Sequence, residues 1–265
     1  MDTSTLVVEN DATDDPRRLG DWLRDAGLAL EVVRPYAGDT LPATLEGYAA
    51  LVVLGGDQHA FAGPEGQPGA PWFPALESLL RKAVRANLPT LGICLGGQLL
   101  ATALGGEVGP AAAGPEIGPR LVARRDAADR DPLFAPLPML LDVLQWHHDE
   151  VTELPAGAVP LAASTDYPHQ AFRAGRCAWG LQFHIECDTE MIADWASTNL
   201  PLLAELGIDP VDLLDRTDAV MDDLAEVWRP FAERYAALAR GELAGVGEAA
   251  AGRRELPLLG NDRHA

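Results

Sequence analysis

Leu91-Gly92-Ile93-Cys94-Leu95-Gly96-Gly97-Gln98-Leu99-Leu100 is the stretch that decides the fold. The apolar run that leads into it, residues 89–93, predicts a buried strand, and the leucines after Cys94 recur at helical spacing. The pattern therefore predicts a strand, a sharp turn and a helix, with Cys94 at the apex. Because the start of a helix favours negative charge, a thiol held there is expected to act as a thiolate nucleophile.

A matching base follows much later in the chain. Trp179-Gly180-Leu181-Gln182-Phe183-His184-Ile185-Glu186 reads as a second apolar strand that ends in His-x-Glu. Residues two apart on a strand share a face, so His184 and Glu186 are expected on one side. Glu186 could then bind one imidazole nitrogen while the other faces the sulfur of Cys94. These three residues are the predicted catalytic triad of nucleophile, base and orienting carboxylate.

At these residues the chain resembles the class I glutamine amidotransferases, whose nucleophile is a cysteine. Gly92-Ile93-Cys94-Leu95-Gly96-Gly97-Gln98 is similar to the nucleophile motif of that family, and His184-Ile185-Glu186 is similar to its His-Pro-Glu. Leu54-Gly55-Gly56 resembles the glycine pair of the oxyanion hole. Trp146-His147-His148-Asp149 resembles the histidine-bearing loop that lines the glutamine pocket. The four motifs occur in the order of the family and span residues 51–186.

The resemblance also implies roles for further residues. Gly56 and Leu95 would donate backbone N–H groups to the oxyanion, although Asp57 stands where the family usually has proline. The substrate contacts that the resemblance implies are Gln98, His147 and His148. The alternative for Gln98, which we favour less, is an ordinary polar residue of the first helical turn. Adjacent residues of a strand point to opposite faces, so the run from residue 147 to 150 is not expected to bind a metal.

The first half of the chain alternates strand and helix patterns, which predicts a mostly parallel sheet flanked by helices. Such an α/β fold is the flavodoxin-like type that the resemblance implies. The expected strands are 5–9, 28–33, 49–54 and 89–93, and the expected helices are 16–26, with Asp14 or Asp15 as its N-cap, and 73–86. Gly56 and Cys94 both follow the carboxyl ends of strands, where open α/β sheets place their sites.

The second half has a different pattern. Short strand-like segments, separated by Pro and Gly, predict a mixed or antiparallel extension of the sheet at 116–123, 139–144, 159–163 and 170–172, and the site strand is expected after them, at 178–183. Helical patterns then cover 190–206 and 210–239, with a break or kink expected at Pro230. We expect an amidotransferase-like domain over 1–195, a helical extension packed on it over 196–240, and a disordered tail over 241–265.

Composition limits the partners. The net charge is −20, from 40 acidic and 20 basic residues, which argues against nucleic acid and anionic membranes. Residues 188–226 hold eleven acidic residues and one basic residue, which is either a solvated face or a docking surface for a basic partner. The three cysteines suggest no disulfide framework, so Cys177 and Cys187 are expected as free thiols. The N-terminus lacks a signal-peptide pattern, and the expected location is the cytoplasm.

The expected function is hydrolysis of the γ-amide of glutamine, or of a γ-glutamyl amide, through a thioester on Cys94. Ammonia or an amine would pass to a separate acceptor or synthase subunit, and the reaction needs no cofactor. A free-standing γ-glutamyl hydrolase or peptidase would use the same residues. A catalytically silent protein that binds a ligand or partner through the same pocket is the third reading, and the complete triad argues against it.

Overall fold

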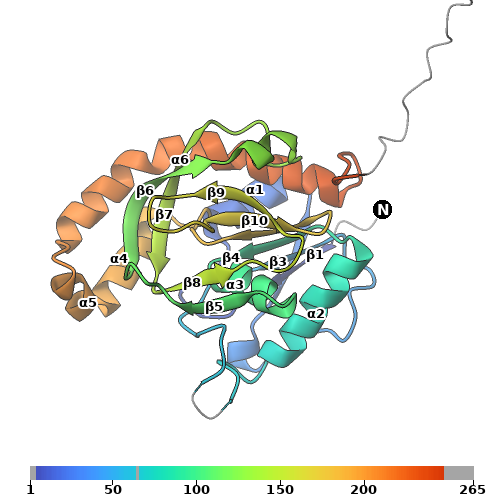
Figure 1. Cartoon of the computed structure of the whole chain (residues 1–265), viewed down its shortest axis with the longest axis horizontal. Helices are drawn as coiled ribbons and strands as arrows, with labels where there is room; N and C mark the ends of the chain where they lie inside the picture. The colour runs from blue at the N-terminus through green and yellow to red at the C-terminus, as the bar shows by residue number, and fades with distance from the viewer. Residues whose placement is uncertain (1–3, 64–65, 248–265) are drawn as a thin grey trace, which may run out of the picture.

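Within residues 4–63 and 66–247, which the computed structural model describes, nine strands form one sheet in the order β2-β1-β3-β4-β11-β10-β9-β6-β7 (Figure 1). The strands from β2 to β11 in this order pair in parallel, and those from β11 to β7 pair antiparallel. The predicted parallel sheet with an antiparallel extension is therefore confirmed. The strands are β1 (Ser4–Val8), β2 (Ala29–Val33), β3 (Ala50–Val53), β4 (Thr90–Ile93), β6 (Glu116–Arg124), β7 (Leu140–His147), β9 (Val159–Ala163), β10 (Ala171–Ala174) and β11 (Ala178–Leu181).

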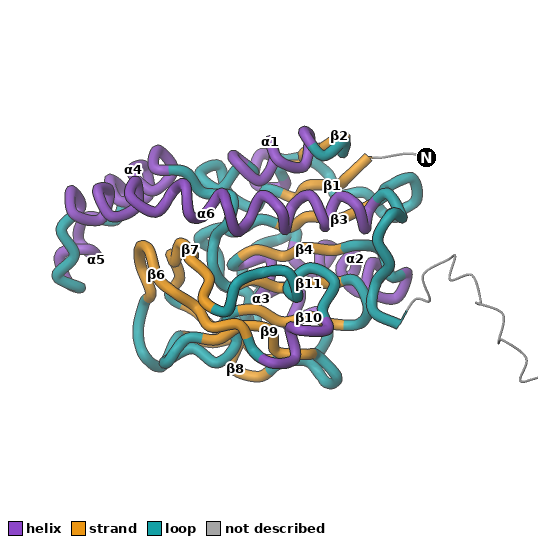
Figure 2. The backbone as a smooth tube through the Cα atoms, turned by 90° about the horizontal axis from the view of Figure 1, so that it is seen from above, coloured by secondary structure: helices purple, strands orange, loops and turns teal. Residues whose placement is uncertain are grey.

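Helices cover both faces of the parallel half (Figure 2). Along β1 and β3, alternate residues point to opposite faces. Val7 and Val52 belong to a core cluster shared with α1 (Arg17–Asp25) and the C-terminal helix α6 (Pro210–Ala239). Their neighbours in sequence belong to a second cluster, shared with α2 (Phe73–Ala86) and α3 (Leu95–Ala103). Burial on both faces explains why these strands are apolar without interruption.

A small second sheet was not expected from the sequence. Strand β5 (Glu107–Pro110) pairs antiparallel with β8 (Asp149–Glu153). Strand β7 ends at His147 and β8 begins at Asp149, so only His148 separates them. The predicted histidine-bearing loop is therefore a junction between two strands, because the backbone of residues 149–153 pairs with a strand that lies about forty residues earlier.

Three helices follow the site strand: α4 (Thr189–Thr198), α5 (Leu200–Glu205) and α6. The expected helix over 190–206 is interrupted at Asn199. Asp209 begins α6, since its side chain accepts hydrogen bonds from the N–H groups of Val211 and Asp212. The division into a domain over 1–195 and an extension over 196–240 stays a prediction. Of the predicted tail over 241–265, residues 248–265 lie outside the described part of the chain.

Helix α6 does not break at Pro230, because it is one helix from Pro210 to Ala239; the alternative expectation, a kink at Pro230, stays a prediction. A proline inside a helix costs about 3 kcal/mol, since it removes a backbone hydrogen bond and crowds the preceding turn. Trp228, Phe231 and Tyr235 are fully buried on the same helix. Each such side chain contributes about 1.5–3 kcal/mol by burial, and together they outweigh that cost.

The described helices include none that combines the length and apolar character needed to cross a bilayer. Helix α6 is long enough, but it is not apolar on all sides. Its exposed face carries acidic residues over much of its length, while its buried face packs on the sheet.

Candidate active site

Cys94 occupies the turn between β4 and α3, as expected. Its backbone has φ 48° and ψ −111°, a conformation that is unfavourable for a residue with a side chain and typical of a nucleophile elbow. The N–H of Cys94 donates to the carbonyl of Leu181 at 2.8 Å, and its carbonyl accepts from the N–H of Gln98 at 3.0 Å. A side chain on Gly96 would collide with the carbonyl of Val53, so glycine lets α3 begin this close to β3.

His184 and Glu186 form a buried pair. Nδ1 of His184 lies 2.6 Å from Oε1 of Glu186, and the N–H of Ile185 donates to Oε2 at 2.9 Å. The sequence analysis placed His184 and Glu186 on one face of a strand. Strand β11 ends at Leu181, however, so neither residue belongs to it. The backbone of His184 is held instead by an isolated antiparallel bridge, in which its N–H donates to the carbonyl of Leu144 at 2.8 Å.

The charges around His184 favour its protonated form. Burial by itself lowers the pKa of His184, but the negative charge of Glu186, helped by the nearby sulfur atoms of Cys187 and Cys94, outweighs burial and holds the pKa well above 6.5. Nε2 of His184 is buried and has no hydrogen-bond partner among the described residues. It is therefore the ring atom that remains free to exchange a proton with a reacting group.

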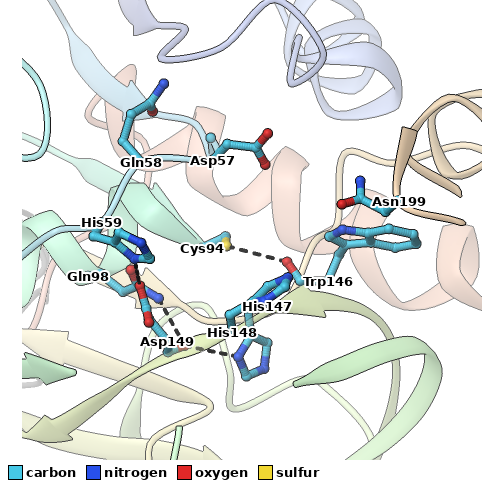
Figure 3. Close-up of a pocket in the computed structure, with 11 residues that line it drawn as sticks. Asp57, Gln58, His59, Cys94, Gln98, Trp146, His147, His148, Asp149 and Asn199 are labelled. Atoms are coloured by element: carbon cyan, nitrogen blue, oxygen red, sulfur yellow. Dashed lines mark hydrogen bonds and ion pairs between the residues drawn. The ribbon is translucent and has the colours of Figure 1, made fainter. Parts of the chain in front are cut away.

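Cys94 lines a cavity of about 320 Å³, which we call the main cavity (Figure 3). Its sulfur lies 3.9 Å from the carbonyl oxygen of Trp146 and 3.8 Å from Nε2 of Gln182. The lining residues are Gly56, Asp57, Gln58, His59, Cys94, Gln98, Trp146, His147, His148, Asp149 and Asn199.

The three predicted substrate contacts, Gln98, His147 and His148, all line this cavity, but they differ in what they can offer. Nε2 of Gln98 already donates to the carbonyl of Asp149 at 3.1 Å. His147 is buried, with Nδ1 3.0 Å from the same carbonyl and Nε2 3.2 Å from Oε2 of Glu116. Gln98 and His147 thus shape the wall, whereas the exposed His148 presents its ring to the cavity (Figure 3).

Gly56 and Leu95, the predicted oxyanion donors, are neighbours. A Cβ atom on Gly56 would lie 3.2 Å from Cδ2 of Leu95, and the φ of 154° at Gly56 favours glycine. Leu95 is the first residue of α3, so its N–H has no partner within the helix. Gly56 and Cys94 line the same cavity, which is the placement that an oxyanion hole requires.

Two residues that support the site were not assigned to it from the sequence. Asn10 ties the turn after β3 in place: its Nδ2 donates to the carbonyl of Leu54 at 2.8 Å, and its Oδ1 accepts from Nε1 of Trp72 at 3.0 Å. Asn10 follows β1 at the same sheet edge as Gly56 and Cys94, and this placement could have identified it. His59 lies at the cavity mouth, where its Nδ1 is 2.5 Å from Oδ2 of Asp149.

A second cavity of about 160 Å³, which we call the side chamber, also contains Cys94 in its wall. The two cavities share Gly56, Asp57, Cys94, Trp146 and Asn199. The side chamber alone is lined by Asp11, Thr13, Asp14, His184, Trp195 and Thr198. Cys94 therefore lies between the two cavities, with His184 on the side of the smaller one.

Asp14 or Asp15 was expected as the N-cap of this helix, but Pro16 takes the N-cap position of α1. Asp14 is only 4% exposed, and its Oδ1 has no hydrogen-bond partner among the described residues. Burial raises the pKa of Asp14 well above 3.8; the positive charge of His184 opposes this rise, while the charge of Glu186 and a hydrogen bond to it add to the rise. A second acidic side chain, besides Glu186, thus lies beside His184.

Among the described residues, one group of donor atoms is close enough together to hold a metal ion: those of His184, Glu186 and Cys187, within 4.8 Å of one another. Nδ1 of His184 and Oε1 of Glu186 share a hydrogen bond, and all three side chains are buried. This arrangement suits a base held by a carboxylate. All three cysteines of the chain are free and buried.

A cysteine at a strand-to-helix elbow, beside a histidine–glutamate pair on an α/β sheet, has the form of an acyl-transfer site. The class I glutamine amidotransferase family model matches residues 18–191, and the chain belongs to this family. It is 35% identical to the glutamine amidotransferase-like protein YfeJ of Salmonella typhimurium, over 64% of this chain and 70% of that protein. A crystal structure of a glutamine amidotransferase from Thermotoga maritima superposes with a TM-score of 0.79 at 30% identity, covering 89% of this chain and 99% of that one.

Two further relatives differ in the activity that their names state. Gamma-glutamyl peptidase 5 of Arabidopsis thaliana is 29% identical, over 68% of each chain. The GMP synthase (glutamine-hydrolyzing) of Thermomicrobium roseum is 37% identical over 62% of this chain, but the match spans only 28% of that protein.

Proposed function

We propose that this protein hydrolyses the γ-amide of glutamine or of a γ-glutamyl amide through a thioester on Cys94. The observation that carries the proposal is that Cys94 and His184 line the same cavity, the side chamber. Oε1 of Glu186 lies 2.6 Å from Nδ1 of His184. Membership of the class I glutamine amidotransferase family supports the same chemistry.

In the first half of the reaction, the thiolate of Cys94 attacks the γ-carbonyl carbon. The oxygen becomes an oxyanion, which the N–H groups of Gly56 and Leu95 stabilise; one such donor contributes about 3–4 kcal/mol to acyl transfer. His184, protonated beside Glu186, gives its proton to the amide nitrogen as the carbon–nitrogen bond breaks. Ammonia or an amine leaves, and the γ-glutamyl group remains on the sulfur.

In the second half, water attacks the thioester. His184, now neutral, takes a proton from the water, and the thiolate is released as the carbon–sulfur bond breaks. The products are glutamate and the regenerated enzyme. The residues named so far supply every group that these steps need.

The test is glutamate release from L-glutamine and from a panel of γ-glutamyl amides by the purified protein, beside Cys94→Ala and Cys177→Ala. Cys177 is equally buried but lies outside both cavities, so it is the matched control. We expect Cys94→Ala to lose all turnover and Cys177→Ala to retain it. Full turnover in Cys94→Ala would exclude this mechanism, and no turnover by the unaltered protein would favour a binding protein.

A free-standing γ-glutamyl hydrolase is the second candidate, and the side chamber favours it. Ammonia is about the size of water, which occupies roughly 30 Å³ of liquid, whereas the chamber beside the base measures about 160 Å³. The sequence similarity to gamma-glutamyl peptidase 5 supports this second candidate. If the protein instead supplies a synthase subunit, as the matches to GMP synthases suggest, turnover of glutamine should rise when that subunit is added.

A further inference from the structure

We propose that the side chamber selects γ-glutamyl amides whose leaving amine carries a second, positively charged ammonium group. This inference rests on the proposed function and specifies its substrate class. The chamber lies beside His184, the group that would protonate the departing nitrogen, so the leaving amine is the part of the substrate that enters it.

Acidic side chains outnumber the one basic group of the chamber, the imidazole of His184. Asp11, Asp14 and Asp57 line it, and no lysine or arginine does. The remaining polar groups, on Thr13, Thr198 and Asn199, can each accept a hydrogen bond. An ammonium group brings donors and a positive charge, and it therefore matches a wall of this kind.

A buried acceptor supports the same ligand. Asp14 is 4% exposed, lines the chamber, and has one carboxyl oxygen without any hydrogen-bond partner among the described residues. Buried polar atoms are nearly always paired, so an unpaired one beside a cavity is available to accept a hydrogen bond from a ligand. Desolvation raises the pKa of Asp14 and of Asp57, and the negative charge of Asp11 adds to both shifts. A positive charge in the chamber would relieve that repulsion.

Two indole rings complete the wall. Trp146 and Trp195 line the chamber, with ring centroids 5.5 Å apart and planes at 55°. Faces of tryptophan attract cations and also cover methylene groups, so the pair suits a short alkyl chain that ends in an ammonium group. The net charge of −20 attracts cations to the protein as a whole.

The chemistry is ordinary amide hydrolysis. The carbon–sulfur bond to Cys94 forms, the carbon–nitrogen bond breaks, and the nitrogen takes the proton of His184. The diamine leaves with its second ammonium group unchanged, and water converts the thioester into glutamate.

The experiment compares three γ-glutamyl amides of nearly equal length, made with 1,4-diaminobutane (cationic), pentylamine (neutral) and 4-aminobutanoate (anionic). We expect kcat/KM to be about tenfold higher for the cationic amide than for the neutral one, and lowest for the anionic one. Asp11→Asn keeps the oxygen that accepts from Thr13 but removes the charge, and it should reduce the preference for the cationic amide about fivefold.

Asp15→Asn is the matched control. It removes the same charge four residues away, from a side chain that pairs with Arg17 and lies outside the chamber, so the preference should not change. Equal kcat/KM for the cationic and neutral amides, with hydrolysis still dependent on Cys94, would overturn this inference and leave the proposed function intact.

Binding of the three amides to the Cys94→Ala variant distinguishes the proposed charge selectivity from the proposed hydrolysis. Calorimetry with the same three amides needs no turnover, and the cationic amide should bind about tenfold more tightly than the neutral one. Tight binding of the cationic amide without any turnover by the unaltered protein would refute the proposed hydrolysis and retain the charge selectivity. Equal binding of all three amides would refute the selectivity.

Discussion

The carboxyl group of Asp14 packs against the Cα atom of Gly55, in the space that a Cβ atom would fill. The same point lies 3.2 Å from Cε1 of His184. Gly55 therefore does more than form a turn next to the predicted oxyanion donor: its missing side chain lets the buried carboxyl group of Asp14 and the ring of His184 approach each other.

Gly55→Ala should displace both neighbours. We expect kcat/KM for the best γ-glutamyl amide to fall about a hundredfold, because a shift near 1 Å in a catalytic group has an effect of that order. Gly109→Ala is the control, since its added methyl would meet only Cγ2 of Thr152 at 3.9 Å. Steady-state kinetics of both variants tests this, and equal activities would show that Gly55 does not position the base.

Asp14→Asn should stabilise the protein increasingly as the pH rises. The pKa of Asp14 is raised in the fold, so the group favours folding below its unfolded pKa of about 3.9 and loses that contribution as pH rises through the raised value. Asparagine does not titrate and has no such loss. Urea unfolding at about pH 4, 6 and 8 should show a growing gain of the variant over the unaltered protein; a gain that is constant with pH would contradict the buried carboxyl group.

Glu186→Gln should leave the fold intact and reduce kcat/KM about a hundredfold or more, because the amide no longer holds the imidazole in the required tautomer. Removing the charge also lowers the pKa of His184, so the pH dependence of kcat/KM should move toward lower pH. Glu190→Gln changes an exposed carboxylate paired with Arg17 and is the control. An unchanged pH profile in Glu186→Gln would contradict the pairing.

Tyr235→Phe should lower stability without changing activity. The hydroxyl group of Tyr235 donates toward the carbonyls of Leu51 and Pro89, at 2.8 and 3.0 Å, and anchors α6 to the parallel strands. Losing a buried hydrogen bond costs about 1–2 kcal/mol of unfolding free energy. Chemical denaturation measures the loss, and a parallel loss of kcat/KM would mean that α6 also shapes the site.

The sequence predicted those parts of the fold that local patterns determine. Strands β3 and β4 are apolar because both their faces are buried, and the elbow at Cys94 follows from glycines at close approaches of the backbone. The helix α2 lies at its predicted bounds, Phe73–Ala86, because its apolar residues recur at helical spacing up to the left-handed Asn87 that ends it.

Other parts depend on contacts between distant segments. The strand β5, Glu107–Pro110, has no alternation of its own and exists because it pairs with β8. The sequence Asp-Asp-Pro favours a helix cap, and it gives no sign that the carboxyl group of Asp14 lies beside Gly55 and His184. That position depends on contacts between segments that are far apart in the sequence. The helix α6 continues through Pro230 because tertiary burial outweighs a local preference.

The bridge between Leu144 and His184 has a wider consequence. In the order of the sheet, β7 is the last strand and β11 lies four places away, yet the chain just after β11 pairs with β7. The antiparallel half of the sheet thus curls back on itself and closes, at one backbone hydrogen bond, into an incomplete barrel. His184, the predicted base, lies on that bridge, so the pairing that closes the antiparallel half also fixes the backbone that carries the imidazole.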